Sequence, residues 1–174
     1  MSATINRSVT LHEGRVFRLV RENVTLENGV TIDLDIIHHP GASAIVPLTE
    51  NNTLLMIKQY RHATRGFIWE IPAGTLDPDE TPLQCAKREL IEETGFSAKE
   101  WQELGEITPL PGYSDEHIHI FLATDLTPAE QDLDMDEILH VHEIRFDEAV
   151  KMVQRGEIED GKTISGLFMA GIYQ

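Results

Sequence analysis

The chain has 174 residues, of which 14 are lysine or arginine, 30 are aspartate or glutamate and one is cysteine, and its formal charge is −16. This length predicts one domain with a substantial core, and a hydrophobic content of 41% argues against disorder. Residues 1–72 contain as many basic as acidic side chains and have no net charge, so residues 73–174 carry the whole net charge. Because polyanions bind to basic patches, a nucleic-acid partner is not expected.

Other protein classes are excluded by the same composition. No run of about 18 apolar residues is present, so no helix is expected to span a membrane. The first residues contain no apolar core of a secretion signal. The single cysteine, Cys85, excludes an intrachain disulfide framework and a thiolate zinc site. These features together predict a reduced, cytoplasmic setting.

Strands are predicted in the first 72 residues, where apolar residues alternate with polar ones between turn residues. The expected strands cover residues 16–26, 30–37, 42–48, 53–60 and 67–71. Asn28-Gly29 is typical of a tight turn, so the first two strands are expected to form a β-hairpin that can stand apart from the rest.

Helical periodicity begins at Thr81, where Pro82 suits the first turn of a helix, and ends at Gly95, which suits a C-terminal cap. Further on, the sequence predicts strands at 118–123 and 141–146 and closing helices at 147–155 and 162–173. The expected fold class is therefore mixed α/β.

Glu89, Glu92 and Glu93 are spaced so that all three lie on one flank of the predicted helix. Each like-charged pair at this spacing destabilises an isolated helix by about 0.2–0.5 kcal/mol. Converging carboxylates are suitable ligands for Mg²⁺, and Arg88 is one turn before Glu92 and can brace it. A solvated acidic face is the alternative explanation for the three glutamates taken alone.

The longer segment from Gly74 to Phe96 favours the metal site, because it resembles the Nudix box, GX5EX7REUXEEXGU, where U is a bulky apolar residue. All nine fixed positions match: Gly74, Glu80, Arg88, Glu89, Leu90, Glu92, Glu93, Gly95 and Phe96. The resemblance implies a Nudix-type α/β/α sandwich around a mixed sheet. It also implies hydrolysis of a nucleoside diphosphate linked to another group, with a divalent metal as cofactor.

By this resemblance, Glu89 and Glu93 are the main metal ligands, and Glu92 is a further ligand or the catalytic base. The carbonyl of Ala73 is another ligand, and Arg88 and Glu80 orient the glutamates. Mg²⁺ is the expected ion, with Mn²⁺ as an alternative. Such an ion neutralises the diphosphate and lowers the pKa of a bound water, which explains how an acidic site can bind an anionic substrate.

Three flanking features resemble the ADP-ribose pyrophosphatase and nucleoside diphosphate sugar hydrolase subfamily. They are the segment from Trp69 to Gly74, Pro111 after the box, and the strand end Lys58-Gln59-Tyr60-Arg61. The resemblance assigns substrate contacts to Arg61, Glu70 and Glu116. It also implies that a glutamate from a loop after the box is the catalytic base, and Glu137 is preferred there over Asp134 and Asp136.

The subfamily resemblance also predicts the organisation of the chain. Residues 1–40 are expected to be an N-terminal β segment that crosses to the partner subunit of a homodimer, and residues 41–174 are expected to be the Nudix hydrolase domain. The expected substrate is ADP-ribose or a related nucleoside diphosphate sugar, cleaved to a nucleoside monophosphate and a sugar phosphate.

Other activities are open at this point. They are an RNA 5′-pyrophosphohydrolase, a pyrophosphatase for oxidised or ordinary dNTPs, and a Nudix sensor that binds ADP-ribose without cleaving it. A zinc site is a further alternative, since His117/His119 and His140/His142 have strand spacing. Isopentenyl diphosphate isomerases use cysteine at their metal site, and the place of Cys85 inside the box argues against that activity.

Overall fold

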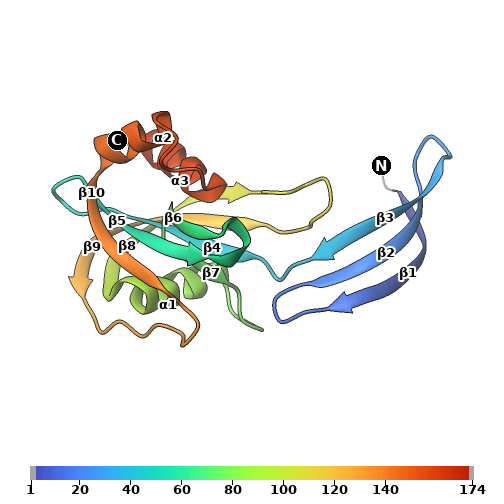
Figure 1. Cartoon of the computed structure of the whole chain (residues 1–174), viewed down its shortest axis with the longest axis horizontal. Helices are drawn as coiled ribbons and strands as arrows, with labels where there is room; N and C mark the ends of the chain where they lie inside the picture. Colours follow the sequence, from blue (N-terminus) through green and yellow to red (C-terminus); the bar gives the residue numbers. More distant parts are fainter. Residues whose placement is uncertain (1–2, 173–174) are drawn as a thin grey trace. The chain divides into compact units, whose positions relative to one another are not determined.

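The structure, a computed structural model, describes residues 3–172 and divides into two compact units (Figure 1). One unit contains the chain up to Gly41 together with Thr108–His117, and the other contains Ala42–Ile107 and the chain from Ile118 onward. The segment 108–117 therefore belongs with the N-terminal part, although the predicted division at residue 40 places it in the larger part. Residues 1–2 and 173–174, which the predicted ranges include, lie outside the described residues.

The smaller unit is built on a three-stranded antiparallel sheet in the order β1-β2-β3, with the strands Thr4–Glu13, Arg18–Thr25 and Thr31–His38. The predicted hairpin is β2 and β3, and Gly29 turns between them with a φ of 80°. Strand β1 was not expected. The segment 108–117 contacts the end of β3, where the Ile37 N–H donates to the Tyr113 carbonyl at 2.8 Å.

The larger unit contains two sheets. One has the order β7-β4-β9-β8 and the other has the order β10-β5-β6. Strands β4 and β9 run parallel, and the other neighbours are antiparallel, so the sheet is mixed as predicted. The strands are β4 (Ala42–Pro47), β5 (Thr53–Arg61), β6 (Gly66–Glu70), β7 (Ala73–Thr75), β8 (Phe96–Ile107), β9 (Ile118–Pro128) and β10 (Leu139–Arg145), with a short 3₁₀ turn, η1, at His62–Thr64.

Three helices cover the sheets: α1 (Pro82–Thr94), α2 (Phe146–Gln154) and α3 (Gly161–Ile172). Figure 1 shows α1 on one side of the sheets and α2 and α3 on the other. Successive side chains of a strand point to opposite faces, and β4 uses both. Ala44 and Val46 pack in the cluster that contains α2 and α3, whereas Ile45 packs with Ala86 and Leu90 of α1. The layers are therefore α/β/α.

Strand β8 is twelve residues long and was not predicted. Its sequence, FSAKEWQELGEI, is rich in residues that favour helices, and it pairs on one side only, with β9. A register shift between Glu103 and Gly105 also interrupts its alternation. Because of its polar side chains and its bulge, this edge strand lacks the alternation of apolar and polar residues by which strands are predicted.

In residues 3–172, no helix has the length and apolar character needed to cross a membrane.

Candidate active site

Helix α1 carries the three glutamates, and its ends are fixed by its own sequence. Thr81 caps the first turn, its hydroxyl accepting from the Gln84 N–H while the Gln84 side chain accepts from the Thr81 N–H. Gly95 ends the helix in the left-handed conformation with a φ of 72°. The predicted helix ends agree with the structure to within one residue.

Two of the three glutamates on this flank of α1 are deeply buried. Glu89 is 8% exposed and Glu93 is 1% exposed, whereas Glu92 is half-buried. The Ala73 N–H, at the start of β7, donates to Glu93 Oε2 at 2.8 Å. The structure therefore places Ala73, the predicted backbone ligand, directly against the most buried of the three glutamates.

Gly74 makes room for the second carboxylate. A Cβ atom built on Gly74 would lie 1.8 Å from Glu89 Oε1 and 2.0 Å from Glu89 Cδ, which is far inside contact distance. Only glycine fits here while Glu89 keeps its position. This explains the glycine that opens the box motif.

Arg88 holds the glutamates in place, as its spacing predicts. Its Nη1 lies 2.6 Å from Glu89 Oε1 and 2.9 Å from Glu92 Oε2. Its Nε and Nη2 donate to the two oxygens of Glu80, both at 2.9 Å, and Nη2 also donates to the Thr75 carbonyl. The pKa of Glu80 is lowered, chiefly by this pairing with Arg88. One guanidinium therefore positions three carboxylates.

Burial shifts the protonation of the two inner glutamates. Desolvation raises the pKa of Glu89 to about 7, against the lowering effect of Arg88, and the charges of Glu92 and Glu137 raise it further. Burial also raises the pKa of Glu93 well above its ordinary value, and the neighbouring charge of Glu89 adds to the shift. Both carboxylates are therefore costly to ionise unless a further cation is present.

The donor set fits a hard divalent cation, because all the predicted ligands are carboxylate or carbonyl oxygens. The raised pKa values point the same way, since a cation would offset the repulsion between the carboxylates. Within residues 3–172, however, no group of three or more His, Cys, Asp or Glu side chains is arranged to hold a metal ion. Arg88 Nη1 lies between Glu89 and Glu92, so a cation there requires these side chains to rearrange.

Arg61 and Glu70, two predicted substrate contacts, bind each other. Arg61 Nε and Nη2 donate to the two oxygens of Glu70 at 2.7 and 2.8 Å. Glu70 is 1% exposed, and the Arg61 side chain remains 41% exposed. Lys162, from the start of α3, also donates to Glu70 Oε2. Burial acts to raise the pKa of Glu70, but Arg61 and Lys162 outweigh it and the pKa is lowered.

The remaining predicted residues lie in different units. Glu137 belongs to the larger unit, where its charge affects both Glu89 and Glu93 and its Oε2 accepts from the Asp134 N–H at 3.1 Å. Glu116 belongs to the smaller unit, where its Oε1 lies 3.8 Å from His39 Nδ1.

The histidines considered as zinc ligands have other neighbours. His140 stacks on Phe67, and His142 meets the edge of the Trp69 ring. His119 lies in β9, whereas His117 lies before it, outside the strand. Like the glutamates, they belong to no metal-binding group in the described part of the chain.

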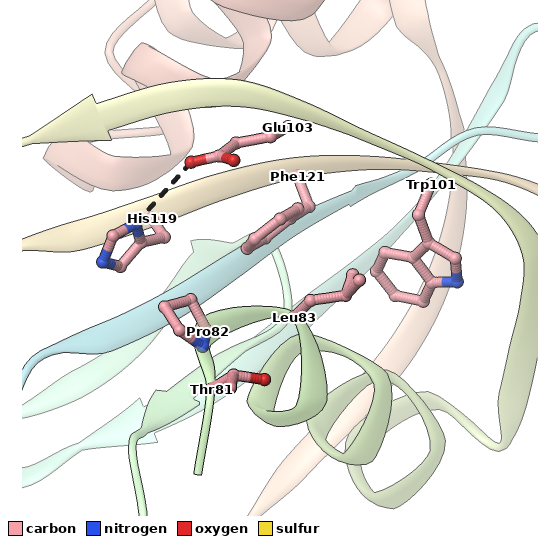
Figure 2. A pocket seen from close by; sticks show the side chains of 7 residues that line it. All are labelled: Thr81, Pro82, Leu83, Trp101, Glu103, His119 and Phe121. Carbon is pink, nitrogen blue, oxygen red and sulfur yellow. Dashed lines mark ion pairs between the residues drawn. The ribbon is translucent and has the colours of Figure 1, made fainter.

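A pocket of about 300 Å³ lies beside the first turn of α1 and the paired strands β8 and β9 (Figure 2). Figure 2 shows the Trp101 and Phe121 rings beside Leu83, with His119 paired to Glu103 at 3.8 Å. The full lining is Thr81, Pro82, Leu83, Trp101, Glu103, His119 and Phe121. None of the predicted site residues is among them.

The sequence pattern did not predict the burial of Gln59 or the contact of Lys162 with Glu70. Gln59 is 4% exposed and lies on β5 between Leu139 and Ile68. Lys162 reaches Glu70 across 92 residues of chain, so no local motif could reveal it.

Comparisons with known proteins agree with the box motif. The family described as "NUDIX domain" matches residues 37–166. An ADP-ribose pyrophosphatase of Bacillus subtilis is 39% identical over 155 residues, covering 88% of this chain and 84% of that protein. A GDP-mannose pyrophosphatase of Escherichia coli is 36% identical over 169 residues, covering 92% of this chain and 82% of that protein.

A crystal structure of an ADP compounds hydrolase has the same fold, with a TM-score of 0.87 at 24% identity over 99% of this chain and 94% of that one. The predicted fold class is thereby confirmed. The chain belongs to the Nudix family, and its similarity to pyrophosphatases of that family extends over most of its length.

Proposed function

We propose that this protein hydrolyses the diphosphate bond of ADP-ribose or a related nucleoside diphosphate sugar, giving a nucleoside monophosphate and a sugar phosphate. The observation that carries the proposal is the pair of buried carboxylates, Glu89 and Glu93, on one helix near Arg61, whose side chain is 41% exposed. The charges of Arg61 and Glu93 are close enough to affect each other. Relatives named ADP-ribose pyrophosphatase and GDP-mannose pyrophosphatase support this substrate class.

Mg²⁺ is the proposed cofactor, with Mn²⁺ as the alternative, and Glu89, Glu92, Glu93 and the Ala73 carbonyl would hold it. When bound, such an ion neutralises the diphosphate and makes a nearby water more acidic. In this scheme Arg88 and Glu80 orient the ligands. Lowering the pKa values of Glu89 and Glu93 on cation binding would let both act as carboxylates at neutral pH.

The remaining roles belong to residues around these glutamates. The exposed guanidinium of Arg61 binds phosphate oxygens, for which its planar fork is suited. Glu137 or Glu92 accepts the proton of the attacking water. Glu116 is proposed to contact the substrate on the side of the terminal sugar or the diphosphate.

We further propose that the working form is a cytoplasmic homodimer. The smaller unit has few buried side chains: Val20 and Val24 are its buried large apolar residues, whereas ten consecutive residues of β1 are exposed. Several apolar side chains remain uncovered there, among them Ile5, Leu11 and Phe17. Exposed apolar side chains gathered on one sheet are typical of a protein–protein contact, and the partner subunit would supply the layer that covers them.

A substrate panel tests the activity. The protein is incubated with Mg²⁺ and ADP-ribose, ADP-glucose, GDP-mannose or UDP-glucose, and released nucleoside monophosphate is measured. We expect turnover of at least one sugar nucleotide, and its absence with all four would overturn the proposal. Faster cleavage of a nucleoside triphosphate or of 5′-triphosphate RNA would assign the chain to one of those activities, and tight binding of intact ADP-ribose without turnover would make it a sensor.

A further inference from the structure

A cluster of charged side chains around the buried Glu70 joins the C-terminal helix α3 to the strands that carry Arg61 and Glu70. The Glu70 carboxylate accepts two hydrogen bonds from Arg61 and one from Lys162. Lys162 Nζ also lies 3.1 Å from Asp160 Oδ2. All four side chains are charged, and the positive and negative charges are equal in number.

The same segment is fixed to the backbone next to Glu70. Asp160 Oδ2 accepts from the Thr163 N–H at 2.9 Å and from the Thr163 hydroxyl at 2.6 Å. The Thr163 Oγ1 atom in turn accepts from the Ile71 N–H at 2.9 Å. Because Thr163 is fully buried, these contacts hold the start of α3, which carries Lys162, next to Ile71.

Arg61 and Lys162 differ in exposure, and this difference indicates different roles for the two side chains. The Arg61 side chain is 41% exposed, so its guanidinium can reach a ligand in solution. Lys162 is 13% exposed, and its ammonium is occupied by Glu70 and Asp160. Lys162 is therefore suited to hold Glu70 rather than to bind phosphate itself.

We propose that Lys162 is a positioning residue for substrate binding, acting through Glu70 on Arg61, and that Glu70 orients Arg61 instead of contacting the substrate. This inference rests on the proposed diphosphate substrate. A carboxylate with only one cationic partner can rotate, and the fork of Arg61 would rotate with it. With Lys162 on Oε2, the carboxylate plane is fixed and presents both oxygens to Arg61.

The test is Lys162→Met, which keeps the length of the side chain and removes its charge. We expect KM for ADP-ribose to rise about tenfold while kcat changes much less, as for a lost hydrogen bond to a charged group that acts on binding. Lys162→Arg should restore much of the affinity. Lys151→Met, on the exposed face of α2, is the matched control and should leave both constants unchanged.

A double-mutant cycle shows whether Lys162 acts through Arg61. In an Arg61→Gln background, Lys162→Met should add little further loss of affinity, because the group that it positions is already gone. Full additivity of the two effects would overturn the proposal. An unchanged KM in a folded Lys162→Met protein would overturn it as well.

Two measurements keep the inference separate from folding and from the proposed activity. If Lys162→Met does not fold, Lys162→Gln keeps a hydrogen-bond donor beside Glu70 while it removes the charge, and the affinity should still be reduced. Calorimetric titration of ADP-ribose gives Kd without turnover. If the wild type binds ADP-ribose without cleaving it and Lys162→Met weakens that binding, the inference is supported and hydrolysis is overturned. If the wild type neither binds nor cleaves ADP-ribose, both are overturned.

Discussion

The carboxylate of Glu89 occupies the space in which a side chain at position 74 would begin, 1.8 Å from the first carbon of that side chain. Gly74→Ala must therefore move either the β7 backbone or Glu89. We expect activity to fall at least tenfold, since small displacements of a catalytic group are costly, and stability to fall by about 1–3 kcal/mol from overpacking.

Turnover and urea denaturation of Gly74→Ala check this expectation. Gly66→Ala is the control, because nothing lies within 4 Å of the added carbon there. Equal activity of the two variants would contradict the assigned role of Glu89.

The pKa of Glu89, raised to about 7, makes stability depend on pH. In the unfolded chain this carboxyl titrates near its ordinary value of about 4.3, so between there and about pH 7 the folded state binds more protons than the unfolded one. Stability without divalent cations should therefore decrease as pH rises through this window. Glu89 contributes at most about 4 kcal/mol to that decrease.

Denaturation in EDTA at pH 5 and pH 8 measures the effect. In Glu89→Gln the difference between the two pH values should shrink, because the titrating group is absent. Adding Mg²⁺ should stabilise the wild type more at pH 8 than at pH 5, since protons and the cation compete for the same oxygens. A wild type that is more stable at pH 8 in EDTA would contradict the burial argument.

Removing one carboxylate charge should lower activity without lowering stability. Glu92→Gln or Glu93→Gln is expected to lower turnover by at least about a hundredfold, in line with the loss of a key electrostatic or acid–base group. Stability in EDTA should be unchanged or increased, because Glu93 is buried and the glutamine oxygen can still accept from the Ala73 N–H. Glu100→Gln, exposed on β8, is the control. Near-normal activity in both box variants would refute the metal assignment.

Gln59 offers a prediction about stability alone. Within residues 3–172, its buried Oε1 atom has no hydrogen-bond partner. Replacing an unsatisfied polar group by an apolar one of similar shape removes a desolvation cost, so Gln59→Met should stabilise the fold by about 1 kcal/mol. Thermal unfolding measures this, with Gln102→Met on the exposed side of β8 as the control. A stability loss would mean that the amide is satisfied in solution.

The helix with its glutamates could be predicted because its information is local. Thr81, Pro82 and Gly95 lie at the ends they determine, and the spacing of Glu89, Glu92 and Glu93 follows from helical geometry. The parallel pairing of β4 with β9 joins residues that are more than seventy positions apart, and no local pattern encodes it.

Strand β1 was missed for a different reason. All ten of its residues are exposed, and two register shifts interrupt its pairing with β2, so its alternation of apolar and polar residues is weak. The contact of Lys162 with Glu70 was equally hidden, because only the folded chain brings α3 to the end of β6. Tertiary contacts of this kind determine how Arg61 is held.

The hydrogen bond from the Ile71 N–H to the Thr163 hydroxyl can form only late in the synthesis of the chain. These residues are separated by 92 positions, so the Ile71 N–H acquires its hydroxyl partner only after Thr163 has left the ribosome. At about 5–20 residues per second, this delay is on the order of 5–20 s. Until then the Ile71 N–H lacks the hydroxyl to which it donates in the finished fold, although the whole Nudix box has already been made.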